Sequence, residues 1–438
     1  MLERLFRLSE HGTTARREVV AGLTTFVTVS YILVVHPQLL AAAGMPFDAV
    51  LFATCVSAAF GSAFMGLVAR YPIVLAPGMG LNAYFSLVVV PLIAKSGYAS
   101  PELAWRAALG CVFISGVLFV LLSVIKVREM IVDAVPIALK VAISAGIGLF
   151  IALIGFQQGG LIKTHPATML TLGDIGSPQA LLTIGGLLLT AGLLAREVKS
   201  AMLWSMLVVT LAALPLGLAK LPAQIVALPQ PSATFLALDI PGALHAGLAN
   251  VIFAFFFVDL FDTLGTLIGV AQQGGLLDDD GRLPRATSAL LADALATLFG
   301  SLVGTSTVTS YVESAAGIAA GGRSGMTAVV AALLFLLALL FAPVFKIVPR
   351  MATAPALIAV GALMMTGVRK IEWKDLSEGI PAFLTIASMA FTFSIAEGIA
   401  FGFVTYAVVK LIAGRAREVS VVGWVLAAVF VARHALLH

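Results

Sequence analysis

Long apolar stretches separated by short polar ones dominate the chain. A helix of about 20 mostly apolar residues is long enough to cross a lipid bilayer. Runs of that kind occupy residues 19–42, 49–69, 104–125, 131–155, 178–195, 199–218, 247–271, 287–303, 327–347 and 352–368. Two shorter apolar stretches follow at 381–396 and 398–413, and a last one at 420–436 is either a further span or an interfacial helix. This pattern predicts an all-α polytopic membrane protein.

Two further apolar segments are interrupted by small and polar residues. Residues 71–89 read YPIVLAPGMGLNAYFSLVV, and residues 304–322 read GTSTVTSYVESAAGIAAGG. Each begins with an extended, β-prone stretch, continues through small residues and ends in a helical pattern. We expect each to form a short strand followed by a half-helix. With them the chain has 14 predicted transmembrane segments, of which segments 3 and 10 are broken.

The two halves of the chain carry the same markers in the same order. AAFGS at 58–62 precedes the first broken segment, and TLFGS at 297–301 precedes the second. Pro136 and Pro355 each follow a short basic loop and lie in matching apolar runs. Segments 1–7 therefore match segments 8–14, and because seven is odd the second half is inverted. A 7+7 inverted repeat with broken helices is typical of secondary transporters, and the breaks locate the substrate site near the midplane.

Composition narrows the class of protein further. Hydrophobic residues make up 60% of the chain and charged residues 11%, and the mean hydropathy is +1.07. An ordinary soluble protein has about 25% charged residues, so the composition excludes a soluble enzyme, a disordered chain and a secreted disulfide scaffold. Cys55 and Cys111 lie in apolar runs and are interpreted as small buried residues. No His pair has metal-ligand spacing, and we expect no metal and no cofactor.

The distribution of Lys and Arg predicts how the chain lies in the membrane. Cytoplasmic segments of membrane proteins are rich in these residues. With the N-terminus in the cytoplasm, most of them fall in cytoplasmic segments, and of those that fall outside, Lys346 and Arg350 fit the orientation least well. The first residues lack the apolar core and cleavage site of a signal peptide. We therefore expect a multi-pass protein of the inner (plasma) membrane, in which basic loops rather than nucleic-acid binding account for the net charge of +4.

Segment 8 carries two carboxylates within FAFFFVDLFDTLGTLIG. Asp259 and Asp262 are three residues apart and share one helical face, which Thr263 and Thr266 flank. Because a charge facing lipid is costly, this face is expected to point inward. The functional interpretation is a binding site for a polar solute or a proton. The alternative is a structural network of hydrogen bonds between helices.

The broken segments carry the opposing polar groups. Glu313 lies close to the N-terminus of the second half-helix, where the helix dipole favours a negative charge, and it can alternate between protonated and charged forms. Asn82 offers a donor and an acceptor, which suits the edge of a heterocycle. Gly78 and Gly80 permit close approach of the backbone. The alternative for both Glu313 and Asn82 is that they cap their half-helices.

Other polar residues in apolar runs receive structural interpretations. Asp293 is expected to support the site or the helix packing, and Asp133 and Lys140 to pair near one end of segment 5. Glu397 is expected to be a capping or solvated group at a turn. His36 is expected to be a satisfied structural histidine, with proton gating as the alternative.

Several long motifs resemble one family of transporters. APGMGLNAYF, FVDLFDTLGTLIGVA, GTSTVTSYVESAAGIAAGGRSG and SIAEGIAFGF occur in this order along the chain. They resemble the AzgA-like branch of the nucleobase–cation symporters, whose members are adenine, guanine and hypoxanthine permeases with a fold of the nucleobase–ascorbate transporter type. The opening AGLTTFVTVSYILVVHPQLLAAAGM resembles this branch too, so the resemblance covers nearly the whole chain.

The resemblance implies a core domain of segments 1–4 and 8–11 and a gate domain of segments 5–7 and 12–14. On this chain the parts are a cytoplasmic N-terminal segment, the core domain, the gate domain, an external loop and a C-terminal segment. In that order they correspond to residues 1–18, 19–125 with 247–347, 126–218 with 348–413, 219–246, and 414–438. The broken segments would contribute short antiparallel strands that meet at the midplane, with substrate bound between them and against segment 8.

The resemblance also implies which residues bind the substrate. Gly80, Asn82, Asp259, Asp262 and Glu313 match the family's site positions. The carboxylates would accept N–H bonds from a purine, Asn82 would lie near the base, and Gly80 would shape the pocket. Apolar residues of segment 8 would enclose the ring. Glu313 and Asp259 would serve in proton coupling.

These observations predict a secondary active transporter, not an enzyme, that imports adenine, guanine or hypoxanthine by proton symport with an elevator-type motion. The expected partners are a purine nucleobase, a proton and the lipid bilayer, and a homodimer would use the gate domain as its interface. The preferred purine and the oligomeric state stay open. An anion exchanger or channel on the same type of fold is the alternative, although the acidic site would repel an anion. A membrane enzyme is disfavoured because its two aspartates would lie on facing helices, not on one.

Overall fold

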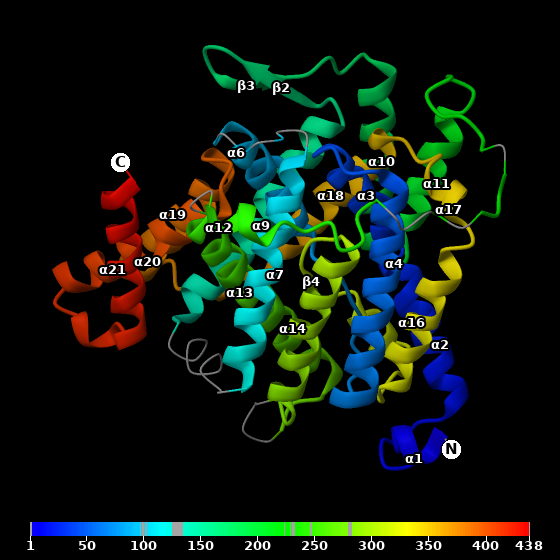
Figure 1. Ribbon diagram of the computed structural model, residues 1–438, viewed down its shortest axis with the longest axis horizontal. Helices are drawn as coiled ribbons and strands as arrows, with labels where there is room; N and C mark the ends of the chain where they lie inside the picture. The colour runs from blue at the N-terminus through cyan, green and yellow to red at the C-terminus, as the bar shows by residue number, and fades with distance from the viewer. Residues whose placement is uncertain are drawn as a thin grey trace.

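The computed structural model describes residues 2–96, 98, 100, 103–124, 135–222, 224–227, 229, 233–245, 248–278 and 283–437. These residues form a bundle of helices with very little strand (Figure 1). Within these ranges, nine helices are long and apolar enough to cross a membrane, and the protein is therefore a multi-pass membrane protein. They are Ala15–Ala41, Phe47–Ala69, Ala104–Val124, Ile137–Gln158, Pro178–Ala195, Val251–Gln272, Ala286–Val303, Arg350–Lys370 and Ile395–Ile412.

The first half of the chain contains helices, two π-helical turns (η1 and η2) and three short strands. In order these are α1 (Leu2–Phe6), α2 (Ala15–Val29), α3 (Ile32–Ala41), α4 (Phe47–Phe64), η1 (Met65–Ala69), β1 (Leu75–Pro77), α5 (Met79–Tyr84), η2 (Phe85–Val89), α6 (Val90–Lys95), α7 (Ala104–Val124), α9 (Ile137–Gln158), β2 (Ile162–His165), β3 (Met169–Leu172), α10 (Pro178–Ala195) and α11 (Ala201–Ala213).

The second half has the same helical character, one strand and two 3₁₀ turns (η4 and η5). Its elements are α12 (Ile240–His245), α13 (Ala249–Gly274), α14 (Ala286–Val303), β4 (Val308–Ser310), α15 (Ser314–Ala319), α16 (Met326–Ala338), α17 (Ala342–Phe345), α18 (Arg350–Met364), η4 (Met365–Lys370), α19 (Leu376–Phe391), α20 (Ile395–Ile412), η5 (Ala416–Glu418) and α21 (Val421–Leu437).

Polar residues and glycines mark where the helices begin and end. The hydroxyl of Ser177 accepts the N–H of Ala180 at the start of α10, and Pro178 takes the first helical position, where an N–H has no partner. Gly304 follows α14 with a φ of +102°, a left-handed conformation that side chains disfavour. The turn at Gly304 leads the chain into β4.

Strands β1 and β4 form a buried two-stranded antiparallel sheet. Leu75 pairs with Ser310, Ala76 with Thr309, and Pro77 with Val308. The short helix α5 follows β1, and the short helix α15 follows β4. Two chain segments more than half the molecule apart therefore meet in one small sheet.

Hydroxyl groups from two helices complete the hydrogen bonding of this sheet. The hydroxyl of Ser62 on α4 bonds both the N–H and the C=O of Leu75, at 3.0 Å each. The hydroxyl of Thr297 on α14 donates to the C=O of Val308 at 2.9 Å and accepts its N–H at 3.1 Å. Because water is absent from the bilayer core, unsatisfied backbone groups there are costly. Ser62 and Thr297 satisfy them on the outer edge of each strand.

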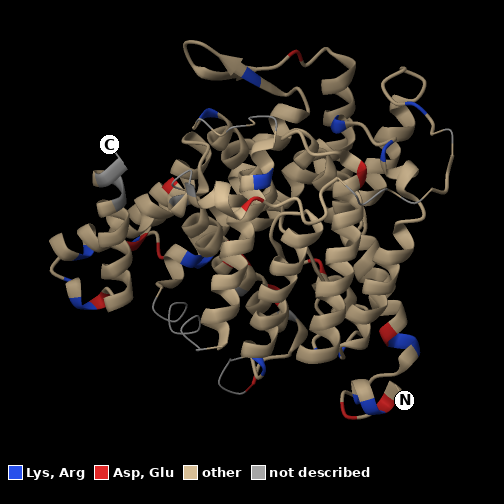
Figure 2. Cartoon of the chain, in the orientation of Figure 1, with Lys and Arg blue, Asp and Glu red and all other residues tan. Residues whose placement is uncertain are grey.

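The helices pack in two sets. In one set, α14 lies against α4 and α7, and α16 lies against α2 and α4. In the other, α9 lies against α18 and α19, and α10 lies against α11 and α18. Glycines bring α9 and α18 close together, since a Cβ added to Gly148 would lie 2.7 Å from the carbonyl oxygen of Gly361. Charged side chains lie mostly at the helix ends and in loops, with a few acidic ones inside the bundle (Figure 2).

Several local features differ from the expectations drawn from the sequence. The first apolar run forms two helices, α2 and α3, which break at Ser30 and Tyr31. The run expected over 327–347 is divided into α16 and α17. Strands β2 and β3 form a hairpin that projects from the top of the bundle in Figure 1. Asp133, expected to pair with Lys140, lies outside the described residues.

Candidate functional site

Helix α13 places its two carboxylates beside different neighbours. Asp259 is fully buried, and its Oδ2 accepts a hydrogen bond of 3.4 Å from the hydroxyl of Thr297 on α14. Asp262 is half-buried and lies next to the end of β1, because its Oδ2 is 3.7 Å from where a Cβ on Gly78 would be. Thus Asp259 contacts the helix that supports the sheet, and Asp262 lies at the junction between β1 and α5.

Asp293 ties α13, α14 and β4 together. Its Oδ2 accepts a hydrogen bond of 2.8 Å from the hydroxyl of Thr263, and its Oδ1 accepts the N–H of Ser310 at 3.2 Å. The hydroxyls of Thr263 and Thr309 are 2.8 Å apart. Asp293 is fully buried. These contacts give it the supporting position expected from the sequence.

Glu313 lies at the N-terminus of α15, one residue before the helix begins. Its side chain makes no capping hydrogen bond to that helix, which excludes the capping interpretation. Instead, Glu313 Oε1 accepts a hydrogen bond of 2.7 Å from the hydroxyl of Tyr31, at the break between α2 and α3. The carboxylates of Asp262, Asp293 and Glu313 are close enough to interact electrostatically. Three acidic groups from three elements therefore surround the sheet.

Asn82 is fully buried on α5 and joins the end of β1 to the residues that lead into β4. Its Nδ2 donates to the carbonyl oxygen of Pro77 at 3.1 Å, and its Oδ1 accepts a hydrogen bond from the hydroxyl of Ser306. Its own N–H bonds the carbonyl oxygen of Gly78 at 2.9 Å. The hydroxyl of Tyr311 donates to the same Pro77 oxygen at 2.5 Å. Asn82 thus holds the turn between β1 and α5 in place beside the chain that leads into β4.

Gly80 lies where α5 touches α9. A Cβ at this position would clash with Cγ2 of Ile147 on α9. Aromatic rings border the same region, with Tyr84 and Phe255 at a centroid distance of 5.4 Å and Phe261 and Phe403 at 6.3 Å. The Phe261–Phe403 contact joins α13 to α20. The five residues singled out from the sequence therefore lie on α5, α13 and the start of α15, around one sheet.

Some polar residues near the site were not identified from the sequence. They are Tyr31, Ser62, Thr297, Ser306 and Tyr311. For most of them a signal exists, because they are hydroxyl residues in or directly before a broken segment. Tyr31 has no such signal, since the apolar pattern continues through the break beside it.

The remaining candidates have structural positions. His36 is buried with Nε2 2.6 Å from the hydroxyl oxygen of Thr305, and Glu397 lies in the first turn of α20. Cys55 and Cys111 are buried free thiols. In the described part of the chain, no group of three or more His, Cys, Asp or Glu is placed to hold a metal ion.

Comparison with known proteins identifies the family. Residues 16–431 match the Permease family. The chain belongs to this permease family. It is 44% identical over 431 residues to the adenine permease AdeP of Escherichia coli. This alignment covers 98% of the chain and 95% of the relative. It is 43% identical over 442 residues to the guanine/hypoxanthine permease PbuG of Bacillus subtilis. That alignment covers 98% of this chain and 98% of the relative.

The permease fold also resembles that of solved transporters. The transmembrane domain of the cyanobacterial bicarbonate transporter BicA matches with a TM-score of 0.64, over 88% of this chain and 97% of that chain, at 16% identity. At that identity the likeness shows a shared fold only. The resemblance of the motifs to adenine and guanine/hypoxanthine permeases is confirmed by the relatives. Because permeases are not enzymes, the membrane-enzyme alternative is set aside.

Proposed function

We propose that this permease imports purine nucleobases through a site formed by Gly80, Asn82, Asp259, Asp262 and Glu313. The observation that carries the proposal is the meeting of β1 and β4 beside the carboxylates of α13 and Glu313. Full-length relatives at 44% and 43% identity are named adenine permease and guanine/hypoxanthine permease. We therefore infer adenine, guanine and hypoxanthine as the candidate substrates.

The chemistry of the site suits a purine better than an anion. A purine edge offers N–H donors, which carboxylates accept strongly, and ring nitrogens and oxygens, to which an amide donates. The rings of α13 and Tyr84 supply an apolar surface for a flat ligand. An anion would be repelled by Asp262, Asp293 and Glu313. The bicarbonate transporter shares the fold but not the sequence, so its substrate does not favour the anion-carrier alternative.

We propose that Glu313 and Asp259 couple transport to a proton. A carboxylate that leaves water for the membrane interior is far less costly when protonated. Proton binding would therefore favour the state in which the site is buried, and proton release on the cytoplasmic side would return the site outward. The Tyr31 hydroxyl beside Glu313 is suited to the binding and release of a proton, because it can donate a hydrogen bond to the carboxylate when that is charged.

We further propose a domain motion based on the two packing sets. In the proposed arrangement, 14 segments form a 7+7 inverted repeat, with a core domain at 19–125 and 247–347 and a gate domain at 126–218 and 348–413. The core would slide past the gate along the contact between Gly80 and Ile147. The N-terminus would lie in the cytoplasm, the protein would lie in the inner membrane, and the gate domain would form any homodimer.

The test is uptake of labelled adenine, guanine, hypoxanthine and uracil by cells that lack their own purine carriers. The variants are Asp259→Asn and Glu313→Gln, with Asp48→Asn as the matched control, because Asp48 pairs with Lys346 at the surface. We expect purine uptake in the wild type and the control, and loss in both site variants and with a protonophore. Uptake driven by a sodium gradient alone would overturn proton coupling. Unchanged uptake in both site variants would move the site elsewhere.

A further inference from the structure

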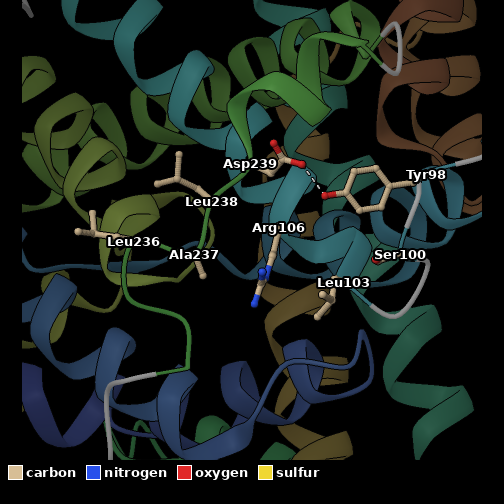
Figure 3. A pocket seen from close by; sticks show the side chains of 8 residues that line it. All are labelled: Tyr98, Ser100, Leu103, Arg106, Leu236, Ala237, Leu238 and Asp239. Atoms are coloured by element: carbon tan, nitrogen blue, oxygen red, sulfur yellow. Dashed lines mark hydrogen bonds between the residues drawn. The ribbon is translucent and has the colours of Figure 1, made fainter.

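A cavity lies beside the first turn of α7, among residues that take no part in the proposed purine site. Its volume is about 440 Å³. One wall carries Tyr98, Ser100, Leu103 and Arg106, and the other is the segment 236–239 that precedes α12 (Figure 3). The cavity therefore combines hydroxyl groups, one cation, one carboxylate and leucines in a small space.

The carboxylate in this cavity is held in place by neighbouring groups. Asp239 Oδ2 accepts a hydrogen bond of 2.6 Å from the hydroxyl of Tyr98, and Oδ1 accepts the N–H of Gly242 at 2.8 Å. Burial, together with the hydrogen bond and negative charge of Asp239, raises the pKa of Tyr98 to about 12. Tyr98 is therefore a stable donor at neutral pH. Each carboxylate oxygen can accept further hydrogen bonds from a ligand.

The cation in this cavity points away from the carboxylate. Figure 3 shows the Arg106 guanidinium directed to the opposite side from Asp239. Its Nε is buried without a hydrogen-bond partner among the described residues, and the guanidinium carbon lies 5.4 Å from the centre of the Trp105 ring. A guanidinium presents parallel N–H donors that match an oxyanion such as phosphate. Arg106 thus places a guanidinium on one side of the cavity while Asp239 offers acceptors on the other.

The position of the cavity indicates where its ligand comes from. Arg106 lies in the first turn of the span Ala104–Val124, and the end of a span lies at the level of the lipid headgroups. Leu236, which lines the cavity, is 59% exposed, and Phe235, the residue before it, is 53% exposed. An apolar rim beside a polar cavity at this depth suits a lipid, whose headgroup is polar and whose chains are not.

We propose that this cavity binds the headgroup of a zwitterionic phospholipid, with the phosphate on Arg106 and the ammonium of ethanolamine on Asp239. The separated charges of the cavity match the separated charges of phosphoethanolamine. Free phosphate, or a headgroup with phosphate alone, would gain Arg106 but would place a second negative charge near Asp239. A choline headgroup has no N–H to donate to Asp239, so its ammonium would gain less.

The test uses the purified full-length protein in detergent, with bound lipid counted by native mass spectrometry and thermal unfolding measured in parallel. The probes are dioleoyl phosphatidylethanolamine, phosphatidylglycerol and phosphatidylcholine, with glycerophosphoethanolamine and inorganic phosphate as soluble arms. We expect the ethanolamine lipid to bind most tightly. Arg106→Gln should weaken its binding about tenfold, the effect of losing one charge-assisted contact. Asp239→Asn should remove the preference for ethanolamine over glycerol.

Lipid binding at this cavity can be tested with variants that lie outside the proposed purine site. Lys95→Gln changes a nearby exposed cation outside the cavity and should bind the ethanolamine lipid like the wild type. If Arg106→Gln does not elute as a folded protein, Arg106→Lys keeps the charge without the paired donors and should bind at an intermediate level. Wild-type lipid binding in both Arg106 variants would overturn the proposal. Tighter binding of soluble glycerophosphoethanolamine than of the lipid would overturn the membrane source.

Discussion

The hydroxyl of Tyr31 donates a hydrogen bond of 2.7 Å to Oε1 of Glu313, although the two residues are 282 positions apart. Tyr31 lies at the break between α2 and α3, and Glu313 lies at the N-terminus of α15. The break between α2 and α3 therefore reaches the carboxylate at the start of α15 and orients it. We expect the Glu313 carboxylate to lose this fixed orientation when the hydroxyl is removed.

Replacing Tyr31 by Phe is expected to weaken purine binding more than it slows transport. A hydrogen bond to a charged group contributes about 1.5–3 kcal/mol, so the apparent KM for purine uptake should rise about tenfold or more. Initial uptake rates over a range of purine concentrations measure the change. Tyr71→Phe is the matched control, because Tyr71 is buried but its hydroxyl accepts the N–H of Arg285 instead. An unchanged KM in Tyr31→Phe would show that the Glu313 side chain needs no such partner.

Substituting Gly80 by Ala should block the contact between α5 and α9. The added methyl would clash with Cγ2 of Ile147, and overpacking costs about 1–3 kcal/mol, so uptake should fall about fivefold or more. The double variant Gly80→Ala with Ile147→Ala should recover much of the uptake, because the clashing atom is removed. Gly185→Ala on α10, where a Cβ would meet nothing within 4 Å, should behave like the wild type. No recovery in the double variant would argue against a purely steric cause.

Glu18 is expected to be essential for stability. Its buried carboxylate on α2 accepts the N–H groups of Arg323 at 2.8 Å and Ser324 at 3.2 Å, and the N–H and hydroxyl of Thr327 at 3.2 and 2.6 Å. In Glu18→Gln, an NH2 group replaces one of the two acceptor oxygens. The N–H donors of this group would then face donors of the protein instead of acceptors. The free energy of unfolding should fall by about 3 kcal/mol.

Thermal or denaturant unfolding in detergent measures that loss. Glu10→Gln is the control, because Glu10 is exposed and pairs only with Arg7 among the described residues. A Glu18→Gln protein as stable as the wild type would mean that the start of α16 finds other acceptors.

The ion pair between Asp375 and Arg415 should make stability depend on acid. Hydrogen bonds from Ser377, and then from Arg415 at 2.6 Å, hold the pKa of Asp375 below its usual range. Because the folded pKa is the lower one, this contribution is present at neutral pH and is lost as the pH falls below about 4, the unfolded pKa, toward the folded pKa.

The melting temperature should therefore fall more steeply with acid in the wild type than in Asp375→Asn. Asp174→Asn, which changes an exposed aspartate elsewhere, should follow the wild type. Since both partners are partly exposed, the difference should shrink in 1 M salt, where the Debye length is about 3 Å. Parallel melting curves for the wild type and Asp375→Asn would rule out this pair as the acid-sensitive contact.

The positions of the long helices could be predicted because the bilayer restricts what can cross it. The run expected over 178–195 is α10, and the run over 287–303 is α14 within one residue. Apolar length alone identifies such helices. The strands at 75–77 and 308–310 lie in segments where Pro, Gly and β-branched residues interrupt the apolar pattern. Asp259, Asp262 and Glu313 could be singled out as candidates because carboxylates are rare in spans.

The partners of these residues could not be predicted, since they depend on contacts between distant parts of the chain. The pairing of Tyr31 with Glu313 joins an apolar stretch with no local signal to a distant half-helix. Glu18 looked like part of a charged N-terminal segment, yet it is fully buried against Arg323, 305 positions away. Residues 236–239 form the second wall of the cavity beside Arg106, and from the sequence this segment could be recognised only as part of a loop.

The hydroxyls of Ser62 and Thr297 have a consequence for how the site meets water. They occupy the N–H and C=O groups of Leu75 and Val308, one residue on each strand of the β1–β4 sheet, so water that reaches these residues would have to displace a side-chain hydroxyl to bond their peptide groups. A carrier that is wetted from one side and then from the other needs a scaffold that neither wetting dissolves. We therefore expect the two hydroxyls to keep the peptide groups of Leu75 and Val308 bonded whether or not water reaches the sheet.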